Sequence, residues 1–143
     1  MKITLSVDSK HSMEVAYSEL ADFLSFFNDD PSSADFYNVL ASHPASQMRV
    51  AVAEKTCLPV ATLEKLATDP SIEVVQKVAG NETALKAFGA ELFKTMIGRD
   101  VSVALDLARH GLDSMKPSVR KAVTAVLMRH EDPDVRDALQ VEE

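Results

Sequence analysis

The chain has 143 residues, 46% of them hydrophobic and 26% charged, a composition typical of one soluble globular domain with its own core. Its net charge of −7 argues against broad, non-specific binding to nucleic acid or to acidic membranes. A single cysteine, Cys57, excludes an intramolecular disulfide framework, and no apolar run approaches the ~20 residues that span a bilayer.

Residues 1–7, MKITLSV, form the first recognisable element. Residues 1–12, MKITLSVDSKHS, lack an apolar core of signal-peptide length, so we expect no secretion and a cytoplasmic location. Within them, residues 1–7 alternate between apolar and polar as in a strand, but an all-helical chain offers such a strand no partner. We therefore expect an extended arm, and the oligomeric state stays open, including a homodimer in which two arms pair.

Proline and glycine divide the rest of the chain into short helices. All six prolines stand at plausible helix starts, and Asp30, Asp69 and Asp132 precede three of them as capping residues. Gly80, Gly98 and Gly111 are expected at helix ends. The predicted helices cover residues 12–27, 32–41, 45–55, 59–67, 70–79, 82–97, 100–110, 115–129 and 133–140.

A recurring pattern indicates how these helices pack. Residues 40–53, LASHPASQMRVAVA, are echoed by residues 66–79, LATDPSIEVVQKVA. Segments that begin at Met48, Val74, Val119 and Val135 all place apolar groups at i and i+4. Such short helices cannot bury their apolar faces alone, so we expect them to stack. The prediction is a single domain over residues 1–143, with a divergent arm and capping helix over 1–30 and stacked helical repeats over 31–143.

Residues 40–86 resemble a leucine-rich repeat variant, and PSVRKAV and HEDPDVRDAL, within residues 114–140, resemble the second helix of HEAT-type repeats. This resemblance implies an all-α fold, a right-handed α-superhelix of about eight or nine short helices. The leucine-rich repeat variant prototype holds an iron–sulfur cluster on cysteines. Because this chain has only Cys57, we expect no cofactor.

No catalytic motif or metal-ligand spacing is present in the sequence. His11, His43, His110 and His130 form neither an H-x₃-H nor an H-E-x-x-H arrangement, and no motif supplies a base to activate Cys57. We therefore expect no catalytic residue, no metal and no enzymatic activity. The favoured function is an interaction or adaptor module that binds a protein or peptide on the superhelix surface.

The expected protein-binding residues lie on the inner helices of the superhelix. They are Arg49, Gln76, Lys77, Arg120, Lys121 and Arg136. The arginines lie near helix N-termini, where the helix dipole disfavours a cation, so each needs an acidic partner or must point away. A structural ladder of arginine–aspartate contacts, through Asp69, Asp132 or Asp134, is therefore the alternative to binding.

The alternative function is nucleic-acid binding through residues 86–129. This segment has eight basic and four acidic residues, whereas residues 1–43 have a net charge of −5. The candidate contacts are Arg99, Arg109, Lys116, Arg120, Lys121 and Arg129. Eight bases spread over several helices are also typical of solvated faces, and few aromatic residues are available to stack on bases. Pairing of this segment with the acidic region of another copy is a further alternative.

Overall fold

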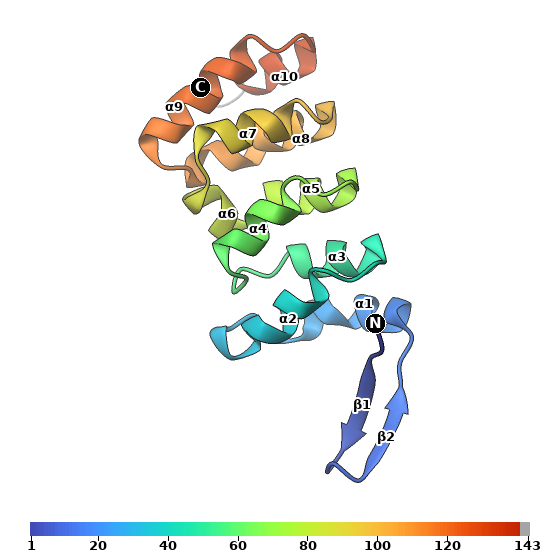
Figure 1. Ribbon diagram of the computed structural model, residues 1–143. Helices are drawn as coiled ribbons and strands as arrows, with labels where there is room; N and C mark the ends of the chain where they lie inside the picture. The colour runs from blue at the N-terminus through green and yellow to red at the C-terminus, as the bar shows by residue number, and fades with distance from the viewer. Residues whose placement is uncertain (141–143) are drawn as a thin grey trace.

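A computed structural model describes residues 1–140 as a mainly α-helical protein that begins with a small β-hairpin (Figure 1). The strands and helices in this range are β1 Thr4–Val7, β2 His11–Glu14, α1 Tyr17–Phe23, α2 Ala34–Leu40, α3 Ser46–Ala53, α4 Val60–Leu66, α5 Ile72–Ala79, α6 Glu82–Ala87, α7 Ala90–Ile97, α8 Val101–Asp106, α9 Pro117–Met128 and α10 Pro133–Ala138. Within the same range, no helix has the length and apolarity that a membrane crossing needs.

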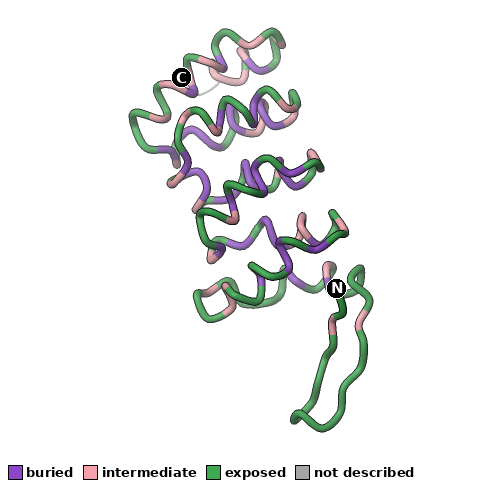
Figure 2. Tube along the Cα trace, viewed as in Figure 1, coloured by how far each residue is buried: buried purple, intermediate pink, exposed green. Residues whose placement is uncertain are grey.

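The helices stack in two layers with the core between them (Figures 1 and 2). Layer A contains α1, α3, α5, α8 and α10, each packed against the next. Layer B contains α2, α4, α6, α7 and α9; α4 packs against α6, and α7 packs against α9. The expectation that short helices bury their apolar faces by stacking is therefore confirmed for residues 1–140.

One position recurs in layer A. Four of its helices have N-caps at Ala45, Ser71, Asp100 and Asp132. The third residue after each cap is fully buried; these residues are Met48, Val74, Val103 and Val135. The sequence pattern predicted three of the four, but it placed Val119 where Val103 belongs. Val119 instead lies on α9, in layer B. The intervals between the caps of layer A widen from 26 to 32 residues along the chain, so the four buried positions do not recur at a fixed spacing.

The N-terminal prediction was wrong about pairing. Residues 1–7 are not a lone extended arm, because β1 pairs with β2 in an antiparallel hairpin that aligns Leu5 with Met13. Asp8 and Ser9 both adopt positive φ in the connecting turn, and Lys10 N–H donates to the Val7 carbonyl at 3.1 Å. The first helix consequently begins at Tyr17 rather than at residue 12, and the fold is mainly α rather than all-α.

Two predicted helices differ from the observed ones, one by a break and the other by a change of helix type. The helix expected over 82–97 breaks at Phe88, whose backbone is extended and whose side chain is buried, to give α6 and α7. The helix expected over 100–110 continues from α8 into a π-helical turn, Leu107–Gly111. A Cβ at Gly111 would lie 3.0 Å from Leu107 Cδ2 and 3.2 Å from Leu85 Cδ2, so this turn packs closely enough to favour glycine.

Candidate protein-binding surface

Arg49 is held inside the stack rather than presented at its surface. Its Nε and Nη2 atoms donate to the two carboxylate oxygens of Asp69 at 2.8 and 3.1 Å. Its Nη1 donates to the carbonyl oxygens of His43 and Pro44 at 2.8 and 3.0 Å. The side chains of Arg49 and Asp69 are only 16% and 7% exposed. Arg49 therefore joins the turn before α3 to the turn before α5, which is the structural alternative expected for the arginines.

The electrostatics of Asp69 agree with this role. Burial acts to raise the pKa of Asp69. This effect is outweighed by hydrogen bonds from Arg49 and from the N–H of Ser71, and by the positive charges of Arg49 and Arg99. The net effect lowers the pKa of Asp69 below its usual value. The Asp69 carboxylate therefore stays ionised, and paired with Arg49, to a lower pH than an ordinary aspartate would.

Arg136 has the corresponding position in α10. Its Nη1 donates to the carbonyl oxygens of His130 and Glu131, the latter at 2.9 Å. In both turns a histidine Nδ1 accepts an N–H two residues further on, at 3.0 Å: His43 from Ala45 and His130 from Asp132. The turns before α3 and α10 are thus stabilised by the same hydrogen bonds, accepted by a histidine and donated by an arginine six residues later.

His43 gives the fold a pH dependence. Its side chain is buried beside the Tyr17 ring, and burial, followed by the charges of the N-terminus and Arg49, lowers the pKa of His43. As pH decreases, His43 is therefore protonated in the unfolded chain before it is protonated in the folded chain. The free energy of unfolding consequently falls as pH decreases below about 6.5. We expect His43→Asn to flatten this fall in urea denaturation between about pH 7 and pH 5. Equal slopes for the variant and the parent protein would contradict this role of His43.

Gln76 and Lys77 lie on the outward face of layer A, next to two shallow hollows of about 280 and 350 Å³. Both hollows are lined by Val50 of α3 and by Lys77 of α5. Lys77 Nζ lies 2.8 Å from Glu54 Oε1, and both side chains are nearly half exposed. The two hollows therefore adjoin each other along Val50 and Lys77, and we treat them together as one region of the surface of α3 and α5.

We call this region the acidic strip. Its charged groups are Asp22, Glu54, Glu73 and Asp106, from layer A or its helix ends, against the single base Lys77. Small or branched side chains form its floor, namely Ala21, Val50 and Ala51, which are partly buried. The sequence did not reveal the strip, because these carboxylates lie on, or at the end of, four separate helices and become neighbours only when the helices stack.

Arg120 and Lys121 lie elsewhere. Both belong to α9 in layer B and line a separate hollow of about 580 Å³ that also includes Met128. Arg120 Nη2 lies 2.9 Å from Asp113 Oδ1, and these side chains are 47% and 74% exposed. The structure therefore does not bring the six predicted protein-binding residues together on the helices of one layer.

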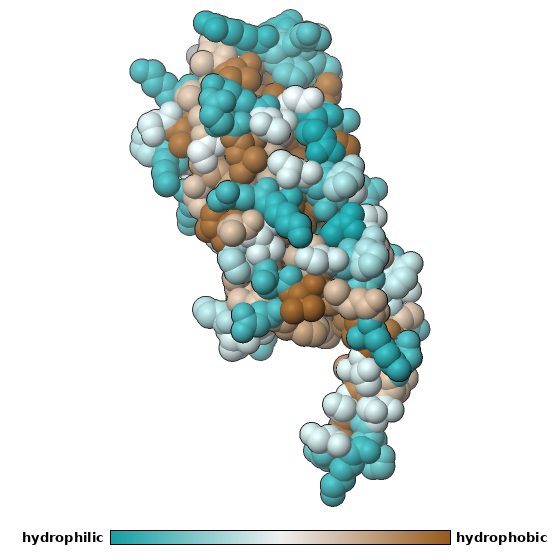
Figure 3. Space-filling model, in the orientation of Figure 1, coloured by the Kyte–Doolittle hydropathy of each residue, from teal (hydrophilic) through white to brown (hydrophobic). Residues whose placement is uncertain are grey.

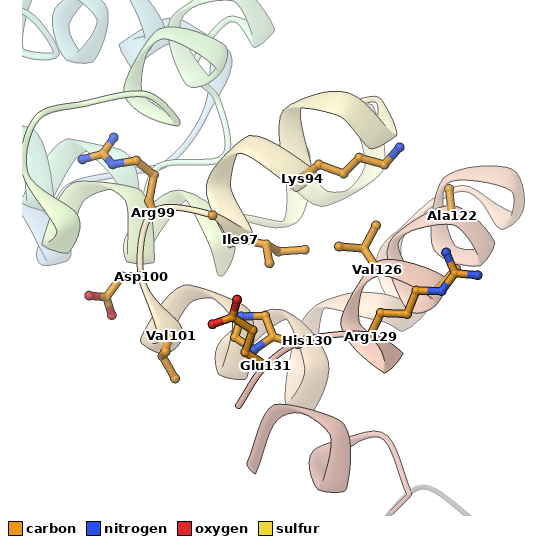
Figure 4. Close-up of a pocket in the computed structure, with 12 residues that line it drawn as sticks. Lys94, Ile97, Arg99, Asp100, Val101, Ala122, Val126, Arg129, His130 and Glu131 are labelled. Atoms are coloured by element: carbon orange, nitrogen blue, oxygen red, sulfur yellow. The ribbon is translucent and has the colours of Figure 1, made fainter. Parts of the chain in front are cut away.

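The predicted nucleic-acid contacts are also dispersed. Arg109 lies on the π-helical turn that follows α8, in layer A, whereas Lys116, Arg120 and Lys121 begin α9 in layer B. Arg99 donates to the Pro70 carbonyl at 3.3 Å and points away from the other bases in Figure 4.

A larger groove of about 980 Å³ lies between α7 and α9. Figure 4 shows Ile97 and Val126 facing each other across it, with the long side chains of Lys94 and Arg129 beside them. Asp100 and Glu131 line the same groove, so its charge is mixed. Because acids and bases both line it, this groove matches a phosphate backbone less well than a uniformly basic one would.

Cys57 lies in the connection between α3 and α4. Asp29 accepts hydrogen bonds from the N–H groups of Thr56 and Cys57 at 2.8 and 2.9 Å. Burial, followed by the neighbouring Asp29, raises the pKa of the Cys57 thiol to about 11. The thiol therefore stays protonated at neutral pH, the less nucleophilic form of cysteine. Among residues 1–140, no three or more His, Cys, Asp or Glu side chains are grouped as metal ligands.

Comparison with protein-family models, curated proteins and solved structures finds no match to this chain.

Proposed function

We propose that this protein is a non-enzymatic interaction module, a right-handed superhelix of stacked helical repeats that binds a partner protein on its acidic strip. The partner segment is basic, with small aliphatic side chains between its lysine or arginine residues. The acidic strip itself carries this proposal, since it combines four carboxylates with an apolar floor over α1, α3, α5 and α8.

Two physical features support a peptide-like partner. The floor residues Ala21, Val50 and Ala51 are short, so a partner backbone can approach the helices closely. The surrounding carboxylates attract positive charge, which raises the rate of encounter and selects against acidic partners. Glu54 is already paired with Lys77, so Glu73 and Asp106 are the carboxylates best placed to meet a lysine or arginine of the partner.

The test is a selection from a phage-displayed library of random short peptides against the immobilised protein. We expect the enriched peptides to carry net positive charge and to bind less tightly as salt is raised. The double variant Glu73→Lys/Asp106→Lys should weaken binding of these peptides by about 2 kcal/mol, roughly 30-fold.

The matched control is Asp35→Lys/Glu64→Lys, which likewise reverses two exposed charges, on α2 and α4 in layer B. It should leave peptide affinity unchanged, and circular dichroism should show all variants equally folded. Enrichment of acidic or purely apolar peptides would contradict the proposal, as would equal weakening by the control.

Nucleic-acid binding through residues 86–129 is the alternative proposal, and the separation of its candidate contacts between layers A and B disfavours it. Three bases of the segment also lie in exposed ion pairs. Lys86 pairs with Glu82 at 3.4 Å, Lys94 pairs with Glu91 at 2.9 Å, and Arg120 pairs with Asp113 at 2.9 Å. A gel-shift titration at about 50 mM salt, where phosphate contacts are strong, should therefore show no retarded band. Strong, steeply salt-dependent retardation would instead favour the alternative.

A further inference from the structure

The acidic strip crosses four neighbouring helices of layer A. One of its hollows reaches from Asp22 of α1 to Lys77 of α5, and the other reaches from Val50 of α3 to Asp106, the last residue of α8. Because α1, α3, α5 and α8 pack side by side in this order, the two hollows follow one another along the stack. The hairpin projects beyond α1 and away from the helices (Figures 1 and 3). The strip is therefore a long, shallow surface rather than a closed pocket.

The packing of the helices sets the spacing of the charges. Each of the four helices supplies one carboxylate, on the helix or at its end: Asp22, Glu54, Glu73 and Asp106. Packed helices lie about 8–10 Å apart, so the carboxylates recur at about this interval, and three intervals span roughly 24–30 Å. Glu73 lies in the first turn of α5, whereas the other three lie near helix C-termini. The long, flexible side chain of lysine accommodates this offset.

This spacing selects one conformation of a bound segment. A polyproline II segment brings every third side chain back to the same face, after about 9.3 Å. A β-strand returns a side chain to one face after about 6.7 Å, which falls out of step with the helices. An α-helix does so after about 10.5 Å, but it is roughly 10–12 Å across and needs a groove. The hollows of the strip are shallow, with volumes of about 280 and 350 Å³, so they fit an extended segment better.

Two carboxamides on the strip suit the main chain of an extended segment. Gln47 lines the first hollow and is exposed, and Gln76 lines the second and is half-buried. A polyproline II main chain has no internal hydrogen bonds, so its N–H and C=O groups need partners when they leave water. A carboxamide supplies both a donor and an acceptor. Gln47 and Gln76 therefore replace part of the water that such a main chain loses on binding.

We propose that the partner segment crosses layer A in an extended, polyproline II-like conformation, with a lysine or arginine at every third residue. This inference rests on the proposed function and adds the conformation, spacing and length of the partner. Each base meets the carboxylate of one helix, and the residues between the bases lie over Ala21, Val50 and Ala51. The span of the strip corresponds to about ten residues at about 3.1 Å each. The base opposite α3 contributes least, because Glu54 is already paired with Lys77.

The test compares three ten-residue peptides by isothermal titration calorimetry with the full chain. The first has lysine at positions 1, 4, 7 and 10, with alanine and serine between. The second has the same composition, with lysine at positions 1, 3, 8 and 10. The third repeats the first with proline at positions 3 and 6, which excludes a helix. We expect the first to bind about tenfold or more tightly than the second, and the third to bind within about threefold of the first.

The possible results separate this inference from the proposed function. Equal affinities of the first two peptides, both weakened by Glu73→Lys/Asp106→Lys, would overturn the spacing but keep the strip as the binding surface. Loss of binding on introduction of proline would overturn the extended conformation in the same way. If none of the three bound at about 50 mM salt, where charge pairs are strong, the proposed function would fail and this inference with it. Asp35→Lys/Glu64→Lys, in layer B, should leave all three affinities unchanged.

Discussion

Replacing Asp69 with alanine is expected to lower the free energy of unfolding by about 3–5 kcal/mol, because it leaves the guanidinium of Arg49 buried without a countercharge. Arg49 is 16% exposed and is held by Asp69 through two hydrogen bonds of 2.8 and 3.1 Å. The same substitution also removes the carboxylate that accepts from Ser71 N–H at 2.9 Å, before α5. Urea denaturation followed by circular dichroism measures the change.

The pair of Lys77 and Glu54 supplies the matched control. Its 2.8 Å contact is as short as that of Arg49 with Asp69, but its side chains are 46% and 44% exposed. Glu54→Ala should therefore change the free energy of unfolding by less than about 1 kcal/mol. Equal effects of Asp69→Ala and Glu54→Ala would contradict the view that burial of the Arg49–Asp69 pair sets its importance.

Asn81→Ala is expected to cost about 3–4 kcal/mol, since each unsatisfied buried group costs about 1–3 kcal/mol. Asn81 is 2% exposed and makes four hydrogen bonds. Its Nδ2 donates to the carbonyl oxygens of Ala53 and Lys55 at 2.9 and 3.0 Å, and its Oδ1 accepts from the N–H groups of Thr83 and Ala84 at 3.0 and 3.2 Å. One side chain thus caps the start of α6 and ties it to the end of α3.

Two further variants separate these roles of Asn81. Asn81→Asp keeps the acceptor for the N-terminus of α6 but loses both donors and places a carboxylate against two carbonyl groups. It should therefore fail to restore stability. Asp132→Ala, which removes only a cap at the start of α10, should cost about 1 kcal/mol. If Asn81→Ala cost no more than Asp132→Ala, the bridge from Asn81 to α3 would be energetically unimportant.

The sequence was most informative where a single residue type determines local geometry. Asp30 and Asp132 cap helical turns that begin with proline, as predicted, with carboxylates that accept the N–H groups of Ser32 and Asp134. Asp69 is not itself the N-cap of α5. Its carboxylate instead accepts a hydrogen bond from the N–H of Ser71, which is the N-cap residue. Capping depends on neighbours along the chain, and a single sequence contains that information.

The features that the sequence missed depend on contacts between distant segments or on atypical turn residues. Asp8-Ser9 lacks the glycine that usually marks a tight hairpin turn, so the pairing of β1 with β2 gave little signal. The apolar stripe over residues 82–97 continues through Phe88 and hides the break between α6 and α7. Glu73 and Asp106 of the acidic strip lie 33 positions apart in the chain and become neighbours only through packing of α5 against α8.

The central claim is that the acidic strip is the partner-binding surface. The most direct test maps backbone amide chemical shifts while an enriched basic peptide is titrated into the ¹⁵N-labelled protein. We predict that the largest shifts fall on Ala21, Val50, Ala51 and Gln76, with little change along α7 and α9. Shifts concentrated at Ile97, Val126 and Arg129, in the groove of Figure 4, would contradict the claim.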